Sequence, residues 1–170
     1  MKRTALVVLL VLVLGVVSAN AQSNVVGLSV STLNNPFFVD LKEGAEEAAA
    51  QLGLTIIATD AQNDANRQLS SVEDLISRGV NILVINPVDS SSVVPAIRAA
   101  NQGGVPVITV DRGADGGIVV SHVASDNVAG GKMAGEFIIE LLGGKGKVVE
   151  LEGIPGTSAA RDRGTGFNAA

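Results

Sequence analysis

Short apolar segments rich in valine, isoleucine and leucine recur along this chain of 170 residues, and stretches with helical periodicity separate them. The first four apolar segments begin about 25 to 30 residues apart, which is the length of one βαβ unit. Strands that read as continuous apolar runs are buried on both faces, so they belong in a parallel sheet flanked by helices. Because crossovers between parallel strands are right-handed, the sequence predicts an α/β fold with a doubly wound, mostly parallel sheet.

The individual elements follow from this periodicity and from the glycines and capping residues between them. The predicted strands occupy residues 25–30, 54–58, 81–85, 105–110, 118–121 and 147–151. The predicted helices occupy residues 38–52, 67–78, 91–102 and 126–142, and a last helix begins near Thr157. Helical spacing predicts that the helix at 38–52 buries Leu41, Ala45, Ala48 and Leu52. The same spacing predicts that the helix at 126–142 buries Met133, Phe137, Ile138 and Leu141.

The composition excludes several classes of protein. The chain has no cysteine, which excludes a disulfide scaffold, a cysteine-based metal site and a thiol nucleophile. It has a single histidine, His122, which excludes a metal motif with two histidines. It has 12 Lys and Arg against 17 Asp and Glu, a formal net charge of −5. An acidic surface repels phosphate backbones, which argues against nucleic acid as a partner. The composition fits a protein that handles a neutral ligand, and nothing in it requires a metal or a cofactor.

The first residues have the three parts of a secretory signal peptide. Met1-Lys2-Arg3 supplies positive charge, residues 5–17 are apolar, and Ala19-Asn20-Ala21 is a small-x-small cleavage signal. We therefore expect residues 1–21 to be a signal peptide that is cleaved after Ala21, so that the mature protein is exported and soluble. The alternative is a membrane anchor, which is disfavoured because the apolar run is shorter than the roughly 20 residues that span a bilayer.

Polar residues follow each of the first five predicted strands. They occupy segments 31–38, 60–64, 86–89, 111–112 and 125–127. In an open α/β sheet, ligands bind beyond the carboxyl ends of the strands, where these segments would gather. The aromatic rings of Phe37 and Phe38 suit the C–H faces of a sugar, and asparagine, aspartate and arginine side chains suit its hydroxyl groups. The pattern predicts a binding site for a monosaccharide.

Each of these residues also has a purely structural interpretation. The phenylalanine pair could open a helix and fill the core, and Asn86 could belong only to a turn. Asp111 and Arg112 could form a surface ion pair of little energetic value. Asp126 fits a helix N-cap better than a ligand contact.

Five segments, in order along the chain, carry a more specific signal. They are Ser-Thr-Leu-Asn-Asn-Pro-Phe-Phe (31–38), Ile-Asn-Pro-Val-Asp (85–89), Pro-Val-Ile-Thr-Val-Asp-Arg (106–112), Val-Ser-His-Val-Ala-Ser-Asp-Asn (120–127) and Gly-Thr-Ser-Ala-Ala-Arg-Asp-Arg-Gly (156–164). Together they resemble the periplasmic ribose-binding family of bacteria, and the resemblance runs over essentially the whole mature chain. It implies a type I periplasmic binding fold, in which two similar α/β lobes joined by a three-stranded hinge close on the sugar.

The resemblance also implies roles for individual residues of this chain. The implied ligand-binding residues are Asn35, Phe37, Phe38, Asn86, Asp111, Arg112, Ser125 and Arg163. The asparagines, Asp111 and Arg112 would bond sugar hydroxyls, and the phenylalanines would stack on the sugar. Arg163 would reach the ligand from the second lobe, and Ser125 would lie near it at the first crossover. Residues 22–125 would form the N-terminal lobe and residues 126–170 the beginning of a C-terminal lobe, so the resemblance predicts a C-terminally truncated chain.

The implied function is capture of ribose in the periplasm and delivery to the membrane subunits of an ABC transporter, with no chemistry on the sugar. A chemoreceptor is a further implied partner, and we expect a monomer that is not an enzyme. Sugars of the allose or galactose type are alternative ligands within this class. A sugar-responsive transcription repressor shares the two-lobed fold, but it would need a DNA-binding helix-turn-helix where the leader stands. A nucleotide-dependent oxidoreductase is disfavoured, because the loop after the first strand lacks the G-x-G-x-x-G motif.

Overall fold

A computed structural model describes residues 24–170 of the protein, so the predicted signal peptide and its cleavage site lie outside the described residues. The strands are β1 (Val25–Val30), β2 (Thr55–Asp60), β3 (Ile82–Ile85), β4 (Val107–Val110) and β5 (Ser121–Val123). The helices are α2 (Pro36–Gln51), α3 (Ala65–Ser77), α4 (Val94–Gln102), α5 (Asn127–Leu141) and α6 (Ser158–Ala169). Within residues 24–170, no helix has the length and apolar character that crossing a membrane requires.

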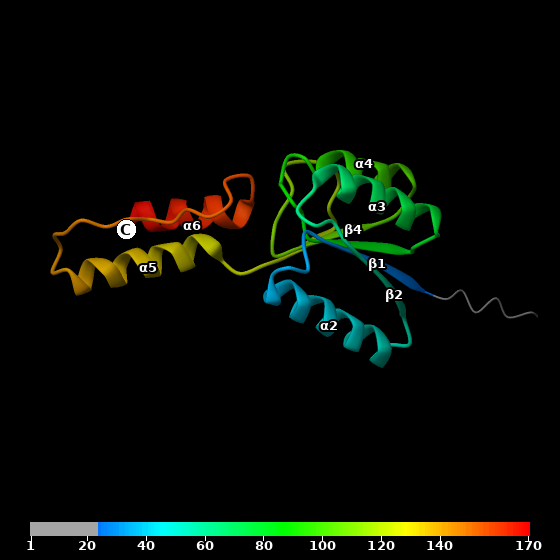
Figure 1. Cartoon of the computed structure of the whole chain (residues 1–170), viewed down its shortest axis with the longest axis horizontal. Coiled ribbons are helices and arrows are strands. Elements are labelled where there is room, and N and C mark those ends of the chain that lie inside the picture. The colour runs from blue at the N-terminus through cyan, green and yellow to red at the C-terminus, as the bar shows by residue number, and fades with distance from the viewer. Residues whose placement is uncertain (1–23) are drawn as a thin grey trace, which may run out of the picture.

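The five strands form one parallel sheet in the order β2-β1-β3-β4-β5. Helix α2 covers one face of the sheet and helices α3 and α4 cover the other, while α5 and α6 lie side by side beyond it (Figure 1). The strand order changes direction between β1 and β3, which is the topological switch point of such a sheet. The predicted α/β fold with a doubly wound parallel sheet is confirmed.

The main hydrophobic core lies between the sheet and helices α3 and α4. Its fully buried residues include Leu83, Ile85, Val72, Leu75 and Ile97. Burial of each such aliphatic side chain contributes about 1.5–3 kcal/mol. This packing holds β1, β3 and β4 in fixed positions, and the candidate site lies just beyond their carboxyl ends.

Helix α2 differs from the prediction in which side chains it buries. Phe38 and Ala49 are its buried residues, whereas Leu52 lies outside the helix and is 71% exposed. Ala48 is also exposed, and Leu41 and Ala45 are half-buried. The reason is that α2 packs only over β1 and β2, at the edge of the sheet, so the covered stripe of the helix is narrower than its apolar stripe.

The predicted strand at 147–151 is wrong. Residues 145–154 have no regular secondary structure, and Val149 and Leu151 are 90% and 92% exposed. A strand needs a hydrogen-bonded neighbour, and none of β1 to β5 pairs with this segment. The fifth strand is present, although it begins at Ser121 rather than at residue 118.

The prediction for the buried face of α5 is also wrong. Met133, Phe137 and Leu141 are 68%, 59% and 68% exposed, and Ile138 is half-buried. The buried residues of α5 are Asn127, Gly131 and Gly135. The helix therefore packs on α6 through its glycines and not through its large apolar side chains.

These glycines allow α5 and α6 to approach closely. A Cβ atom built on Gly131 would overlap the carbonyl oxygen of Arg163, and one built on Gly166 would overlap the carbonyl oxygen of Val128. The backbones thus touch where a side chain would otherwise separate them. The contact fixes the position of α6, which carries Arg163.

Substitution of Gly131 by alanine should destabilise the α5–α6 pair, because the added methyl group forces the two backbones apart. We expect a loss of about 1–3 kcal/mol in the free energy of unfolding. Gly130 precedes it in the same helix with open space around its Cα, so Gly130→Ala should be neutral or stabilising by up to about 1 kcal/mol. Chemical denaturation of both variants in the full-length protein measures this difference, and equal stabilities would contradict the close packing.

Candidate functional site

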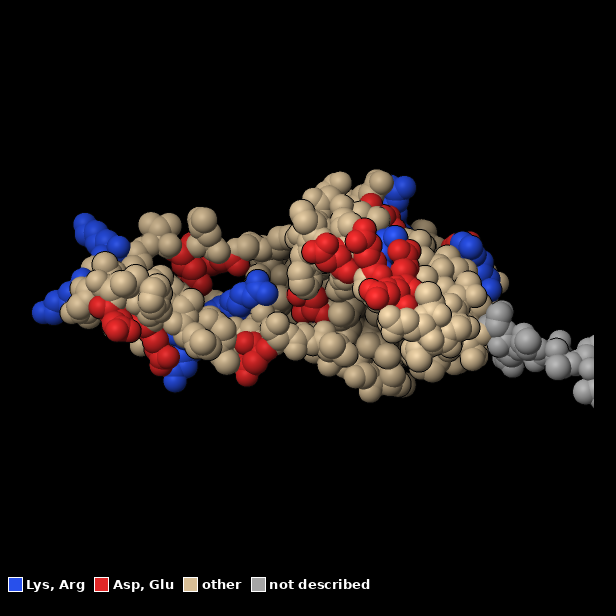
Figure 2. Space-filling model, turned by 90° about the horizontal axis from the view of Figure 1, so that it is seen from below, with Lys and Arg blue, Asp and Glu red and all other residues tan. Residues whose placement is uncertain are grey.

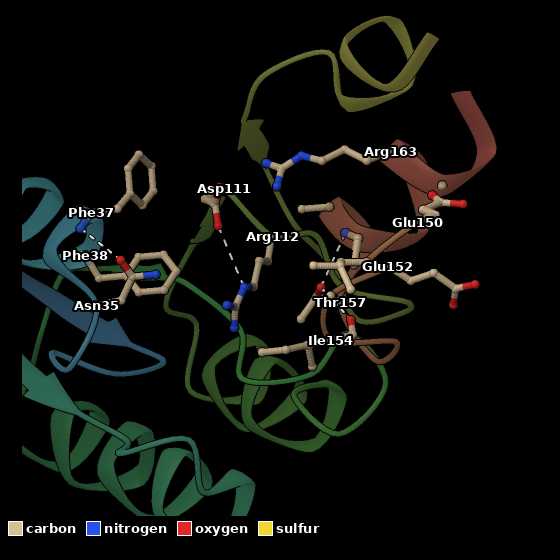
Figure 3. A pocket seen from close by; sticks show the side chains of 15 residues that line it. Asn35, Phe37, Phe38, Asp111, Arg112, Glu150, Glu152, Ile154, Thr157 and Arg163 are labelled. Carbon is tan, nitrogen blue, oxygen red and sulfur yellow. Dashed lines mark hydrogen bonds and ion pairs between the residues drawn. The ribbon is translucent and has the colours of Figure 1, made fainter. Parts of the chain in front are cut away.

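A cavity of about 360 Å³ lies between the carboxyl ends of the strands and the start of α6 (Figure 3). The lining residues on the sheet side are Asn35, Phe37, Phe38, Asp111 and Arg112, and those on the opposite side include Glu150, Glu152, Ile154, Thr157 and Arg163. Figure 2 shows a hollow between the two parts of the molecule, with acidic and basic side chains beside it. Six of the eight predicted site residues line the cavity, and Asn86 and Ser125 do not.

The loop after β1 supplies Asn35 and the two phenylalanines. Asn35 is the N-cap of α2, and its Oδ1 accepts the backbone N–H of Phe37 at 3.0 Å. Phe38 is 2% exposed and belongs to the core as well as to the cavity wall, whereas Phe37 is 54% exposed. The two rings meet edge to face with centroids 5.4 Å apart. The buried ring therefore supports the exposed one, which presents apolar surface to the cavity.

Arg112 is a buried cation held by the core beneath the cavity. Its residue is 9% exposed, its guanidinium carbon lies 5.0 Å from the centroid of the Phe38 ring, and its Nη1 donates to the carbonyl oxygen of Pro87 at 3.1 Å. Burial lowers the pKa of Arg112 from its ordinary value, and the carboxylate of Asp111 opposes this shift. Arginine keeps its charge at neutral pH, so the cavity wall contains a largely desolvated cation.

Asp111 has a backbone conformation that few residues other than glycine adopt. Its φ of +61° lies in the left-handed region, where aspartate is tolerated better than most side chains. The backbone N–H of Asp111 donates to the carbonyl oxygen of Val123 at 2.8 Å, which extends the pairing of β4 with β5. Its Oδ2 lies 3.7 Å from the Nε of Arg112, and both side chains are mostly buried. The pair is therefore not a solvent-exposed ion pair of negligible value.

Asn86 lies directly beneath this pair and is fully buried. Its Oδ1 accepts the hydroxyl of Ser31 at 2.6 Å, and its Nδ2 donates to the carbonyl oxygen of Val110 at 3.0 Å and to Oδ2 of Asp111 at 3.4 Å. Asn86 thus connects the ends of β1, β3 and β4. Asn86 is therefore not only a turn residue, because its side chain also positions the carboxylate of Asp111.

The buried side chain of Gln68 supports the same region and was missed by the sequence reasoning. Its Nε2 donates to the carbonyl oxygen of Asn86 at 2.9 Å, and its Oε1 accepts the backbone N–H of Val88 at 2.9 Å. A glutamine at helical spacing from Val72 and Leu75, both fully buried, is the signal that could have revealed it. Gln68 holds the loop whose carbonyl groups bind Arg112.

The opposite wall comes from α6 and from the segment before it. Arg163 extends from α6 toward the cavity (Figure 3), and its Nε donates to Oδ1 of Asn127 at 2.7 Å. Thr157 is the N-cap of α6, near the predicted start of that helix, and is buried beside the cavity. Glu150 and Glu152 were missed, although Glu152 directly follows the predicted strand at 147–151. The rule that ligands lie beyond strand ends would have pointed to it.

Ser125 lies outside this cavity. It lines a neighbouring hollow of about 370 Å³ that also contacts Asn127, Glu150 and Arg163. Its carbonyl oxygen accepts a hydrogen bond from Nδ2 of Asn127 at 3.2 Å. Asp126 is the N-cap of α5, where its Oδ1 accepts the N–H of Ala129 at 2.9 Å.

Polar contacts hold the start of α6 against the loops of the sheet. The Oγ of Ser158 accepts the N–H of Gly113 at 2.8 Å, and the Oγ of Ser90 accepts the N–H of Ser158 at 3.0 Å. Arg161 and Asp115 form an ion pair at 2.9 Å, which is exposed and so contributes little by itself. Together these contacts set the width of the cavity between β4 and α6.

The chain is similar in sequence to proteins of known role. A family model described as a periplasmic binding protein domain matches residues 26–170. The ribose import binding protein RbsB of Haemophilus influenzae is 53% identical over 169 residues, which covers 99% of this chain and 58% of that protein. The ribose import binding protein RbsB of Bacillus subtilis is 56% identical over 151 residues, which covers 89% of this chain and 50% of that protein. The chain therefore spans only 50% to 58% of the length of these two relatives.

Solved structures show the same fold. An ABC transporter solute binding protein from Mycobacterium smegmatis with bound glycerol has a TM-score of 0.83 and 41% identity, covering 87% of this chain and 51% of that one. A Caulobacter myo-inositol binding protein bound to myo-inositol has a TM-score of 0.77 and 30% identity, covering 88% of this chain and 51% of that one. The resemblance to the ribose-binding family is thus confirmed, and because the family model spans nearly all of the described residues, the chain belongs to the periplasmic binding protein family.

Proposed function

We propose that this protein captures ribose, or a closely related monosaccharide, and delivers it to an ABC transporter. The observation that carries the proposal is the cavity itself. It sets an exposed phenylalanine ring and the buried Asp111–Arg112 pair on one side against Arg163 on the other. The similarity to proteins described as ribose import binding proteins supports ribose as the first sugar to test.

The chemistry of the cavity wall suits a neutral polyol. A sugar ring has apolar C–H faces, which the Phe37 ring can cover, and hydroxyl groups that both donate and accept hydrogen bonds. A carboxylate next to a guanidinium accepts from one hydroxyl and donates to another through charge-assisted bonds. Because the wall carries charges of both signs, it favours an uncharged ligand over an anion or a cation.

The remaining assignments belong to the same proposal. Residues 22–125 form the first lobe and residues 126–170 belong to the second. Closure of the two lobes on the sugar is the signal that membrane subunits and a chemoreceptor would recognise. Asn35, Phe38 and Arg163 complete the set of proposed sugar-binding residues that line the cavity. Asn86, which is fully buried, would act on the sugar by placing the carboxylate of Asp111, and Ser125 would lie near the sugar beside Arg163. The mature protein acts in the periplasm after cleavage behind Ala21. It leaves the sugar chemically unchanged.

Allose is an alternative ligand that a solved relative supports. A solute binding protein from Actinobacillus succinogenes, solved with bound D-allose, has a TM-score of 0.77 and 31% identity to this chain. A pentose and a hexose present similar ring faces, so the outer hydroxyl contacts decide between them. The choice is therefore one of affinity, which a titration can measure.

Isothermal titration calorimetry of the full-length protein should show tighter binding of ribose than of allose or galactose. Removal of one hydroxyl, as in 2-deoxyribose, should weaken binding by about 1–3 kcal/mol, because a buried polar partner is left unpaired. Tighter binding of allose would assign the protein to that sugar. Equal affinity for ribose and 2-deoxyribose would contradict the polar contacts proposed here.

Substitution of Asp111 by asparagine should weaken sugar binding while leaving the fold intact, since asparagine also tolerates a left-handed φ. Loss of the charged acceptor should cost about 1.5–3 kcal/mol, which is roughly a tenfold to hundredfold rise in Kd. Asp111→Ala should weaken binding similarly and also lower stability by about 1–2 kcal/mol, because alanine is strained at this φ. Calorimetry and thermal unfolding separate the two effects, and wild-type affinity in Asp111→Asn would exclude Asp111 as a polar anchor.

Substitution of Gln68 by leucine should impair both stability and sugar binding. The Asn86 carbonyl and the Val88 N–H lose their buried partner, which should cost about 1–3 kcal/mol of unfolding free energy for each unsatisfied group. Gln51→Leu is the matched control, because Gln51 bonds only to Glu47 on the exposed side of α2. Denaturation and calorimetry of both variants test the role, and equal behaviour of the two would refute it.

A further inference from the structure

We propose that Asn127 is a positioning residue for the sugar site and acts by holding the guanidinium of Arg163 toward the cavity. The inference rests on the proposed function, because it concerns how Arg163 is prepared to meet the ligand. Asn127 does not line the cavity, so it would act through Arg163 and not by contact with the sugar.

Both ends of the Asn127 amide are engaged. The residue is 8% exposed at the first position of α5, and its Oδ1 accepts Nε–H of Arg163 at 2.7 Å. Its Nδ2 donates to the carbonyl oxygen of Ser125 at 3.2 Å. The first bond fixes the plane of the guanidinium, because Nε lies in that plane, and leaves the two terminal nitrogens directed forward.

The backbone of Arg163 is held by the same helix. Its carbonyl oxygen packs against Gly131, where a Cβ atom would overlap it. Helix α5 therefore positions Arg163 through two contacts. Gly131 packs against the backbone of Arg163, and the amide of Asn127 binds its guanidinium. Without the amide, the exposed and flexible arginine would have to lose rotamer freedom when the ligand binds, which weakens affinity.

The Asn127 side chain is not needed to cap its own helix. Asp126 already caps α5, since its Oδ1 accepts the N–H of Ala129 at 2.9 Å. The amide instead ties Arg163 to Ser125, in the short segment that joins β5 to α5. A capping role therefore does not explain this arrangement, and positioning of Arg163 does.

A double-mutant cycle in the full-length protein tests the inference, with ribose affinity measured by calorimetry. Asn127→Ala and Arg163→Ala should each weaken binding about tenfold. If Asn127 acts through Arg163, the double variant should bind no more weakly than Arg163→Ala alone. A tenfold further loss in the double variant, or wild-type affinity in Asn127→Ala, would overturn the inference.

Two further variants separate positioning from general structural damage. Asn127→Asp keeps an acceptor for the Nε–H of Arg163. Its ribose affinity should therefore stay within about threefold of wild type, unlike that of Asn127→Ala. Asn101→Ala is the matched control, because Asn101 also makes two hydrogen bonds, both to the backbone of Ile118, and does not line the cavity. Its affinity should equal that of wild type. Failure of Asn127→Asp to restore binding, or a loss in Asn101→Ala as large as in Asn127→Ala, would contradict a positioning role.

A measurement without sugar distinguishes failure of this inference from failure of the proposed function. In a proton–nitrogen NMR spectrum, the Nε–H of Arg163 should exchange slowly with solvent in the wild-type protein, because it is hydrogen-bonded. It should exchange rapidly in Asn127→Ala. Unchanged protection in the variant would overturn the inference whatever the ligand is. Absence of ribose and allose binding by the wild-type protein would instead overturn the proposed sugar, with the NMR result still deciding the role of Asn127.

Discussion

Parallel pairing brings Ser29 of β1, Ile85 of β3 and Thr109 of β4 into one row across the sheet. The chain leaves each strand just beyond this row, so the loops that carry Asn35 and Asp111 meet at a single edge of the sheet. Antiparallel pairing would have sent alternate loops to opposite edges. The site on the sheet side depends on this common strand direction, and the core under α3 and α4 keeps the three strands in place.

A buried cation is costly unless its surroundings satisfy it, and the structure shows how Arg112 is satisfied. The carbonyl oxygens of Pro87 and Val88 accept hydrogen bonds from its Nη1, the Phe38 ring packs against it and Asp111 supplies the opposite charge. Gln68 and Asn86 hold these partners from below. The polar groups that would meet a ligand are therefore prepared before it arrives, and the cost of ordering them is met during folding.

The opposite wall of the cavity is held in place by close backbone packing and not by a buried ion pair. There, α5 and α6 are held together by direct backbone contact at Gly131 and Gly166, and the position of Arg163 follows from that contact. Large apolar side chains of α5 face outward instead. A substitution in α5 should therefore alter the cavity by moving α6 and Arg163. A substitution in the sheet core should alter it by moving Arg112.

Local sequence signals determined much of this protein. The continuous apolar runs defined β1 to β4, the capping residue Asp126 marked the start of α5, and α6 begins near Thr157 as expected. Six of the eight predicted site residues line one cavity. Contacts between distant segments decided the rest. The strand predicted at 147–151 did not form because pairing needs a neighbour, and the outward turn of Met133 and Phe137 follows from the glycine contact with α6. The supporting roles of Gln68, Asn86 and Asn127 depend on atoms brought together from separate elements, and hydrophobic periodicity along one segment carries no information about such partners.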